Sequence, residues 1–149
     1  MPVLPDRPLA GDARGDGARG SCLCGGVAYV VVRPFLRCRT CHCSRCRKAS
    51  SAANVTYLVT ALGGVRFSRG EQLLATFHVP GARYSTTVLC TECGSRMPRL
   101  DEERGIAIVP MGSLDDDPGA RSERHIFVGS RAPWHVITDD LPRDEAAPA

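Results

Sequence analysis

Residues 20–33 read GSCLCGGVAYVVVR and join a cysteine pair to a strand-forming run. The run over residues 25–33 is rich in β-branched and aromatic residues and follows a glycine turn, which predicts a β-strand. In a flat strand the sulfurs of Cys22 and Cys24 would lie about 7 Å apart, whereas zinc-bound sulfurs lie about 3.8 Å apart. The two glycines after the pair free the backbone to turn, so we expect both thiolates to face one metal ion.

A second cysteine pair, Cys90 and Cys93, comes much later in the chain and is also followed by glycine. Four thiolates are the ligand set of a tetrahedral structural zinc site, so the two pairs together predict one closed site. Metal binding of this kind can contribute more free energy than a small domain gains from folding alone. We therefore expect the site to staple the fold, although four buried free cysteines are the alternative.

Short segments rich in β-formers recur about every ten residues, with Gly and Pro between them. Helical periodicity is weak throughout the chain. This pattern predicts a mainly β domain with little helix. Besides the run quoted above, we expect strands over residues 52–59, 65–68, 73–79, 84–89, 105–110 and 135–138.

Length and composition are those of one soluble globular domain, with 149 residues, 43% of them hydrophobic and 23% charged. We predict a flexible tail over residues 1–19, the folded domain over 20–142 and a flexible end over 143–149. No apolar run approaches the roughly 20 residues that cross a bilayer, which excludes a membrane-spanning helix. The net charge of +3 is far below that of a dedicated nucleic-acid binder.

The first twenty residues alternate Pro, Gly, Asp and Arg and lack the apolar segment of a secretory signal peptide. We therefore expect a reducing, cytoplasmic location. Thiols persist in such a compartment, so the eight cysteines indicate metal binding or catalysis rather than disulfides.

Residues 38–46 read CRTCHCSRC and contain the remaining four cysteines. Three arrangements fit this spacing: a closed metal site that uses all four, an open site of three with Cys38 idle, or a site in which His42 replaces a neighbouring thiolate. A second closed site would add little support to so small a chain, which favours the open arrangement. An open position is what a catalytic zinc needs.

Four motifs follow one another in the chain. They are Gly20–Tyr29 (GSCLCGGVAY), Cys41–Lys48 (CHCSRCRK), Cys90–Gly94 (CTECG) and His125–Trp134 (HIFVGSRAPW). In this order they resemble the glutathione-dependent formaldehyde-activating enzymes and their relatives, which include centromere protein V. The resemblance covers about residues 20–145. It implies coiled antiparallel sheets stapled by zinc, similar to the fold of a Rab-binding exchange chaperone.

The resemblance also implies two Zn²⁺ ions per chain. The structural ion of such enzymes is held by the positions that match Cys22, Cys24, Cys90 and Cys93. The catalytic ion is held by the positions that match Cys41, Cys43 and Cys46. Cys38 lies outside the shared pattern, and we treat it as a spare or substituting thiol.

The implied activity is the addition of glutathione to formaldehyde, formally the reverse of a carbon–sulfur lyase step. An open zinc position could bind the thiol as thiolate or polarise the aldehyde, and the negative charge of three cysteinates favours the thiolate role. Cations beside the ligands would offset that charge and receive the glutathione carboxylates, namely Arg45, Arg47 and Lys48. The alternative for these three is a solvated basic edge.

Two other functions stay open. A non-catalytic zinc module could bind protein or nucleic acid through the basic rim, and an enzyme of this type could use another thiol or another small aldehyde. For three further features we expect structural roles. His42 should pack or cap the cysteine loop, Trp134 should pack in the core or a seam, and Asp115–Asp117 should form a solvated turn.

Overall fold

The computed structural model describes residues 17–148, whose regular structure is mainly β-strand. The strands are β1 (Gly17–Ser21), β2 (Ala28–Val32), β3 (Phe35–Cys41), β4 (Val55–Ala61), β5 (Val65–Arg69), β6 (Leu74–His78), β7 (Thr86–Cys90), β8 (Arg96–Met97), β9 (Arg99–Asp101), β10 (Ile106–Pro110), β11 (His125–Ile126) and β12 (Arg143–Asp144). The helical segments are α1 (Ser44–Ser50) and the 3₁₀ turns η1 (Leu62–Gly64), η2 (Glu71–Leu73), η3 (Met111–Ser113) and η4 (Val128–Ser130). The prediction of a mainly β fold with little helix is confirmed.

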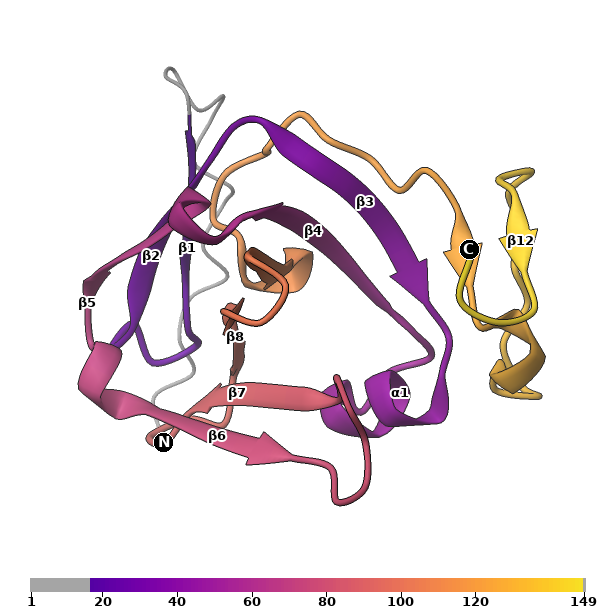
Figure 1. Ribbon diagram of the computed structural model, residues 1–149, viewed down its shortest axis with the longest axis horizontal. Helices are drawn as coiled ribbons and strands as arrows, with labels where there is room; N and C mark the ends of the chain where they lie inside the picture. Colours follow the sequence, from indigo (N-terminus) through magenta and orange to yellow (C-terminus); the bar gives the residue numbers. More distant parts are fainter. Residues whose placement is uncertain (1–16, 149) are drawn as a thin grey trace.

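The strands form three sheets, ordered β1-β2-β5, β12-β11-β3-β4-β10-β9 and β6-β7-β8. Pairing is antiparallel except at β11, which runs parallel to both β3 and β12. In Figure 1, β2 and β5 lie on the left, β3 and β4 curve along the upper right, and β6 and β7 lie along the bottom. The three sheets therefore face a common interior.

The core of the protein takes side chains from all three sheets. Tyr29 of β2, Leu58 of β4 and Met97 of β8 are almost completely buried in one apolar cluster. Burial of each such side chain stabilises a fold by roughly 1.5–3 kcal/mol. Cys22 and Cys90 belong to the same cluster, so the paired cysteines pack directly against the core.

Two expectations about secondary structure need correction. Residues 135–138 form no strand, and the place beside β11 that is not taken by β3 is taken by Arg143–Asp144 of β12. Conversely, residues 44–50 form α1, which buries none of its side chains completely and so has no apolar period to reveal it. The helix starts where the Cys43 sulfur accepts the Cys46 N–H at 3.3 Å, a cap that Ser or Asp more often provides.

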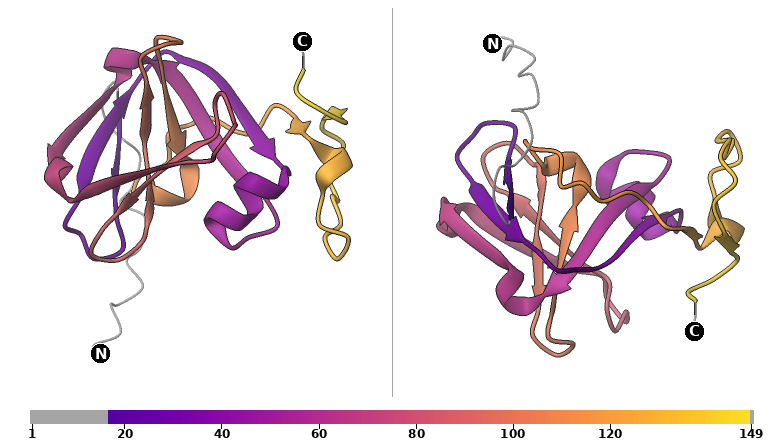
Figure 2. Two further views of the ribbon diagram at one scale, coloured as in Figure 1. Left: turned by 60° about the horizontal axis from the view of Figure 1, so that its bottom comes forward. Right: turned by 90° about the horizontal axis from the view of Figure 1, so that it is seen from above.

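The ends of the folded part differ from the expected boundaries. Gly17–Arg19, assigned to the tail by sequence, belong to β1, whereas residues 1–16 lie outside the described part of the chain. Arg143–Asp144, in the expected flexible end, form β12 beside β11. Both views in Figure 2 show this C-terminal segment at the outer side of the sheets. In residues 17–148 no helix is long and apolar enough to cross a membrane.

The acidic turn Asp115–Asp117 is not the solvated turn that the sequence predicted. Asp116 is buried, and Arg19 of β1 encloses its carboxylate with hydrogen bonds from the backbone N–H (2.9 Å), Nε (2.8 Å) and Nη2 (2.8 Å). Asp115 accepts a hydrogen bond from Ser21 Oγ at 2.9 Å. Only Asp117 is exposed, where it pairs with Arg121. The turn therefore fastens β1 to the segment that follows η3.

We predict that Asp116→Asn lowers the free energy of unfolding by about 1–3 kcal/mol, since it weakens charge-assisted hydrogen bonds to a buried group. The hydrogen bonds from Arg19 hold the pKa of Asp116 below its usual range. This contribution to stability is therefore present above the ordinary aspartate pKa and is lost as the pH falls through the folded-state pKa. Urea denaturation at neutral and acid pH measures both effects. Asp117→Asn, at an exposed pair, is the control, and equal losses in the two variants would refute the prediction.

Candidate metal centre

Two tight turns bring four cysteine sulfurs together, those of Cys22, Cys24, Cys90 and Cys93. All four Sγ atoms lie within 4.8 Å of one another. The Sγ atoms of Cys22 and Cys24 are 3.5 Å apart, and those of Cys24 and Cys90 are 3.9 Å apart. A tetrahedral zinc with Zn–S bonds of about 2.3 Å places its sulfurs about 3.8 Å apart, whereas a disulfide requires about 2.05 Å. The donor set and its spacing fit a closed zinc site.

Backbone conformation explains how these sulfurs converge. Gly25 and Gly94 adopt left-handed φ angles of 75° and 72°, which glycine accepts without steric cost. Each closes a turn by donating its N–H to the carbonyl of the first cysteine of its pair, at 2.9 and 2.8 Å. The Leu23 N–H donates to Ser95 Oγ at 2.9 Å and joins one turn to the other. The chain thus builds the cluster with hydrogen bonds that do not depend on the sulfurs.

Nearby donors prepare these thiols for metal binding. The Val27 N–H points at Cys22 Sγ from 3.1 Å. Burial raises the pKa of Cys93, but hydrogen bonds from the Ser95 side chain and N–H outweigh it and lower that pKa to about 6. The Gly26 N–H lowers the pKa of Cys24, but the adjacent thiols raise it to about 12. One thiolate thus forms readily, and the remaining protons must leave when a cation binds.

A second cluster joins Cys41 at the end of β3 to Cys43 and Cys46 around the start of α1. Their three Sγ atoms lie within 4.8 Å of one another. Hydrogen bonds from the Cys41 and Cys46 thiols, followed by backbone N–H groups, lower the pKa of Cys43 well below its usual value. These hydrogen bonds therefore favour the thiolate form of Cys43, the N-cap residue of α1. Three sulfur donors fit a zinc ion that keeps one position open.

Neither candidate for a fourth protein ligand joins this cluster. Cys38 precedes Cys41 by an odd number of residues along β3, so its side chain faces the other side of the sheet. There it is buried with its Sγ 3.4 Å from the Met111 sulfur. His42 also lies outside the group, and its Nε2 is 2.8 Å from His125 Nδ1. Of the three arrangements that the spacing allowed, the structure contains the one with three thiols.

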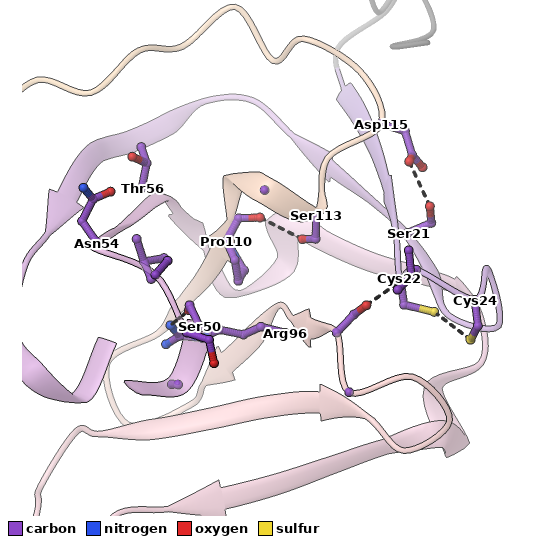
Figure 3. A pocket seen from close by; sticks show the side chains of 18 of the residues that line it. Ser21, Cys22, Cys24, Ser50, Asn54, Thr56, Arg96, Pro110, Ser113 and Asp115 are labelled. Atoms are coloured by element: carbon purple, nitrogen blue, oxygen red, sulfur yellow. Dashed lines mark hydrogen bonds between the residues drawn. The ribbon is translucent and has the colours of Figure 1, made fainter. Parts of the chain in front are cut away.

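A pocket with a volume of about 1340 Å³ lies between the turn that carries Cys22 and Cys24 and the end of α1. Cys22 and Cys24 line one wall, and the last turn of α1 with the start of β4 lines another (Figure 3). Val55 in this second wall pairs with Cys41 in the β3–β4 register. The pocket therefore adjoins the strand and helix that carry the three-thiol cluster.

The family model of the glutathione-dependent formaldehyde-activating enzymes matches residues 17–130, which include all seven cysteines of the two clusters. The chain belongs to this family. The crystal structure of a Rhodobacter sphaeroides protein is similar with a TM-score of 0.52 and 24% identity, and covers 64% of this chain and 86% of that chain. At this identity the likeness supports the fold alone. Comparison with curated proteins gave no match.

Several cationic side chains lie near the second cluster and the pocket. Arg45 and Lys48 are exposed on α1, and Arg47 is half-buried with an Nε that has no partner among the described residues. The sequence analysis missed Arg96, which lines the pocket and donates from Nη1 to Ser50 Oγ at 3.0 Å. Its charge acts on Cys46, where it opposes the rise in pKa that the Cys43 thiolate causes. No local sequence pattern identifies Arg96 as a site residue, because the pairing of β8 with β7 brings it to the pocket.

The fourth motif of the family resemblance, residues 125–134, contributes a histidine that packs on the second cluster. His42 is fully buried between His125 and His135, whose ring centroids lie 5.0 and 5.7 Å away. Burial, followed by the charge of His125, lowers the pKa of His42 to about 4, so it is neutral at pH 7. Trp134, in contrast, does not pack as predicted and is 70% exposed. It follows Pro133 in the outer C-terminal segment, where no element covers it.

We predict that Cys22→Ser and Cys93→Ser each prevent stable folding, because they open the site that joins the first and third sheets. Cys43→Ser should fold and lose one metal ion, because its cluster is built within a single β-strand and helix. Circular dichroism and elemental analysis of the purified variants measure fold and zinc content.

Cys38→Ser is the matched control, and it should keep the zinc content of the wild type. Loss of an ion from this variant would make Cys38 a ligand. Unfolding of the Cys43 variant to the same extent as the Cys22 variant would make both clusters structural.

Proposed function

We propose that the protein is a zinc-dependent enzyme of the carbon–sulfur lyase type, which adds glutathione or a similar thiol to formaldehyde or another small aldehyde. The observation that carries the proposal is the three-thiol cluster, whose strand and helix adjoin a pocket, in a chain of the formaldehyde-activating family. We further propose two zinc ions per chain and a cytoplasmic location, where glutathione is abundant and all eight cysteines can stay reduced.

The proposed reaction forms one carbon–sulfur bond. The thiol sulfur attacks the aldehyde carbon, the carbon–oxygen π bond breaks, and the thiol proton ends on the new hydroxyl oxygen. Zinc at Cys41, Cys43 and Cys46 would supply an open position that lowers the pKa of a bound thiol. The three cysteines give the site a negative charge, which suits the exchange of one thiolate for another.

The chain's own side chains would orient the thiol substrate. Arg96 lies in the pocket wall with its guanidinium beside Ser50, close enough to Cys46 to influence its pKa. A guanidinium of this kind is well shaped to receive a carboxylate. The second carboxylate of glutathione would contact the cations of α1, namely Arg45, Arg47 and Lys48. Their position on α1 keeps them within one turn of Cys46.

We predict that zinc-loaded protein accelerates the exchange between free glutathione and S-(hydroxymethyl)glutathione beyond the spontaneous rate. Exchange NMR of a glutathione and formaldehyde mixture measures both rates in one sample. Cys43→Ser should remove the acceleration because it opens the three-thiol cluster, whereas Cys38→Ser should retain it. A wild-type rate equal to the spontaneous rate would refute the proposed activity.

We predict that Arg96→Gln raises KM for glutathione about tenfold or more, since a charge-assisted hydrogen bond contributes about 1.5–3 kcal/mol. The value for 2-mercaptoethanol, which has no carboxylate, should stay unchanged. Arg66→Gln, on the exposed surface of β5, is the matched control. An equal change for both thiols would show that Arg96 supports the fold and not the carboxylate.

A further inference from the structure

Three side chains form a hydrogen-bonded chain that runs from the second cysteine cluster to the C-terminal segment. His42 Nε2 lies 2.8 Å from His125 Nδ1, and His125 Nε2 lies 3.0 Å from both oxygens of Asp139. His42 and His125 are buried, while the Asp139 side chain is half-exposed. The chain thus reaches from the interior to the surface.

The carboxylate at its outer end sets the direction of the first hydrogen bond, and a neutral His125 sets the direction of the second. Asp139 is kept ionised by the Leu141 N–H and by His125, which lower its pKa. A carboxylate can only accept, so His125 carries its proton on Nε2. In a neutral ring the Nδ1 of His125 then accepts, and His42 must donate from Nε2. The Asp139 carboxylate therefore sets the tautomer of His42 through His125.

This arrangement leaves His42 Nδ1 without a proton. The atom is buried and has no hydrogen-bond partner among the described residues. Buried polar atoms in folded proteins are almost always paired, so this unpaired nitrogen is an exception that calls for an explanation. His42 stands between the ligands Cys41 and Cys43, which places this acceptor within the loop of the second cluster.

Backbone contacts beside these side chains also hold the loop between Cys41 and Cys43 in place. The His42 N–H donates to the Ile126 carbonyl at 3.0 Å, and β11 pairs with the end of β3 in parallel. Asp139 lies beyond residue 130, where the family match ends. The C-terminal segment thus adds a support for the loop that the matched region alone does not contain.

We propose that Asp139 and His125 are positioning residues for the second metal site. Through His42 they hold the loop between Cys41 and Cys43 in place, and they select the tautomer in which His42 Nε2 carries the proton. This inference rests on the proposed second zinc site. No new covalent step is involved.

The test compares Asp139→Ala with Asp140→Ala, a neighbouring exposed carboxylate, in the full-length zinc-loaded protein. Competition with a chromogenic chelator should show that Asp139→Ala lowers the affinity for one of the two zinc ions by about tenfold to a hundredfold. Loss of a residue that hydrogen-bonds to a metal site from outside the ligand set typically has an effect of this size. Asp140→Ala should bind both ions as the wild type does. Asp139→Asn, which keeps an acceptor oxygen, should recover part of the affinity.

Long-range ¹H–¹⁵N NMR of histidine-labelled protein reads the tautomers directly. The wild type should show His42 protonated on Nε2, and Asp139→Ala should show a mixture of tautomers. A wild-type His42 protonated on Nδ1, or equal zinc affinities in the Asp139 and Asp140 variants, would overturn the inference. A wild type with only one zinc ion would instead remove the proposed function, while the NMR result would still report on the hydrogen-bonded chain.

Discussion

The convergence of two cysteine pairs is the constraint on which the rest of this molecule depends. One pair follows β1 and the other follows β7, so the four sulfurs tie the first sheet to the third. The apolar core is small and draws on every sheet, and Cys22 and Cys90 are part of it. A metal ion bound here would lock the geometry of the core itself, because the sulfurs and the packed side chains share the same strands.

The second cluster has the same kind of donor atoms as the first but different surroundings. Cys41, Cys43 and Cys46 come from one strand end and one short helix, so their arrangement depends little on distant parts of the fold. Cys38 is directed to the opposite side of β3 by the alternation of the strand. The pleat of β3 thus keeps the thiol of Cys38 away from the three-thiol cluster.

Segments far away in the sequence contribute the surroundings of the three-thiol cluster. β8 places Arg96 in the pocket wall, and β11 places His125 against His42. The half-exposed Asp139 then connects this buried region to the surface. A site with an open position must hold its ligands firmly without filling the position, and supporting hydrogen bonds from outside the ligand set achieve this.

The sequence by itself determined what depends on local spacing. Cys22-x-Cys24 and Cys90-x-x-Cys93, each followed by glycine, specify turns that direct two sulfurs the same way, and β-branched runs specify most of the strands. The tertiary structure alone decided which distant groups meet. Residues 135–138 form no strand, since Arg143–Asp144 pair with β11 instead, and Trp134 is exposed because no element covers it. Pairings such as Arg19 with Asp116 or His125 with Asp139 carry no signature in either segment, since hydrogen bonds between side chains depend on proximity in space and not on spacing along the chain.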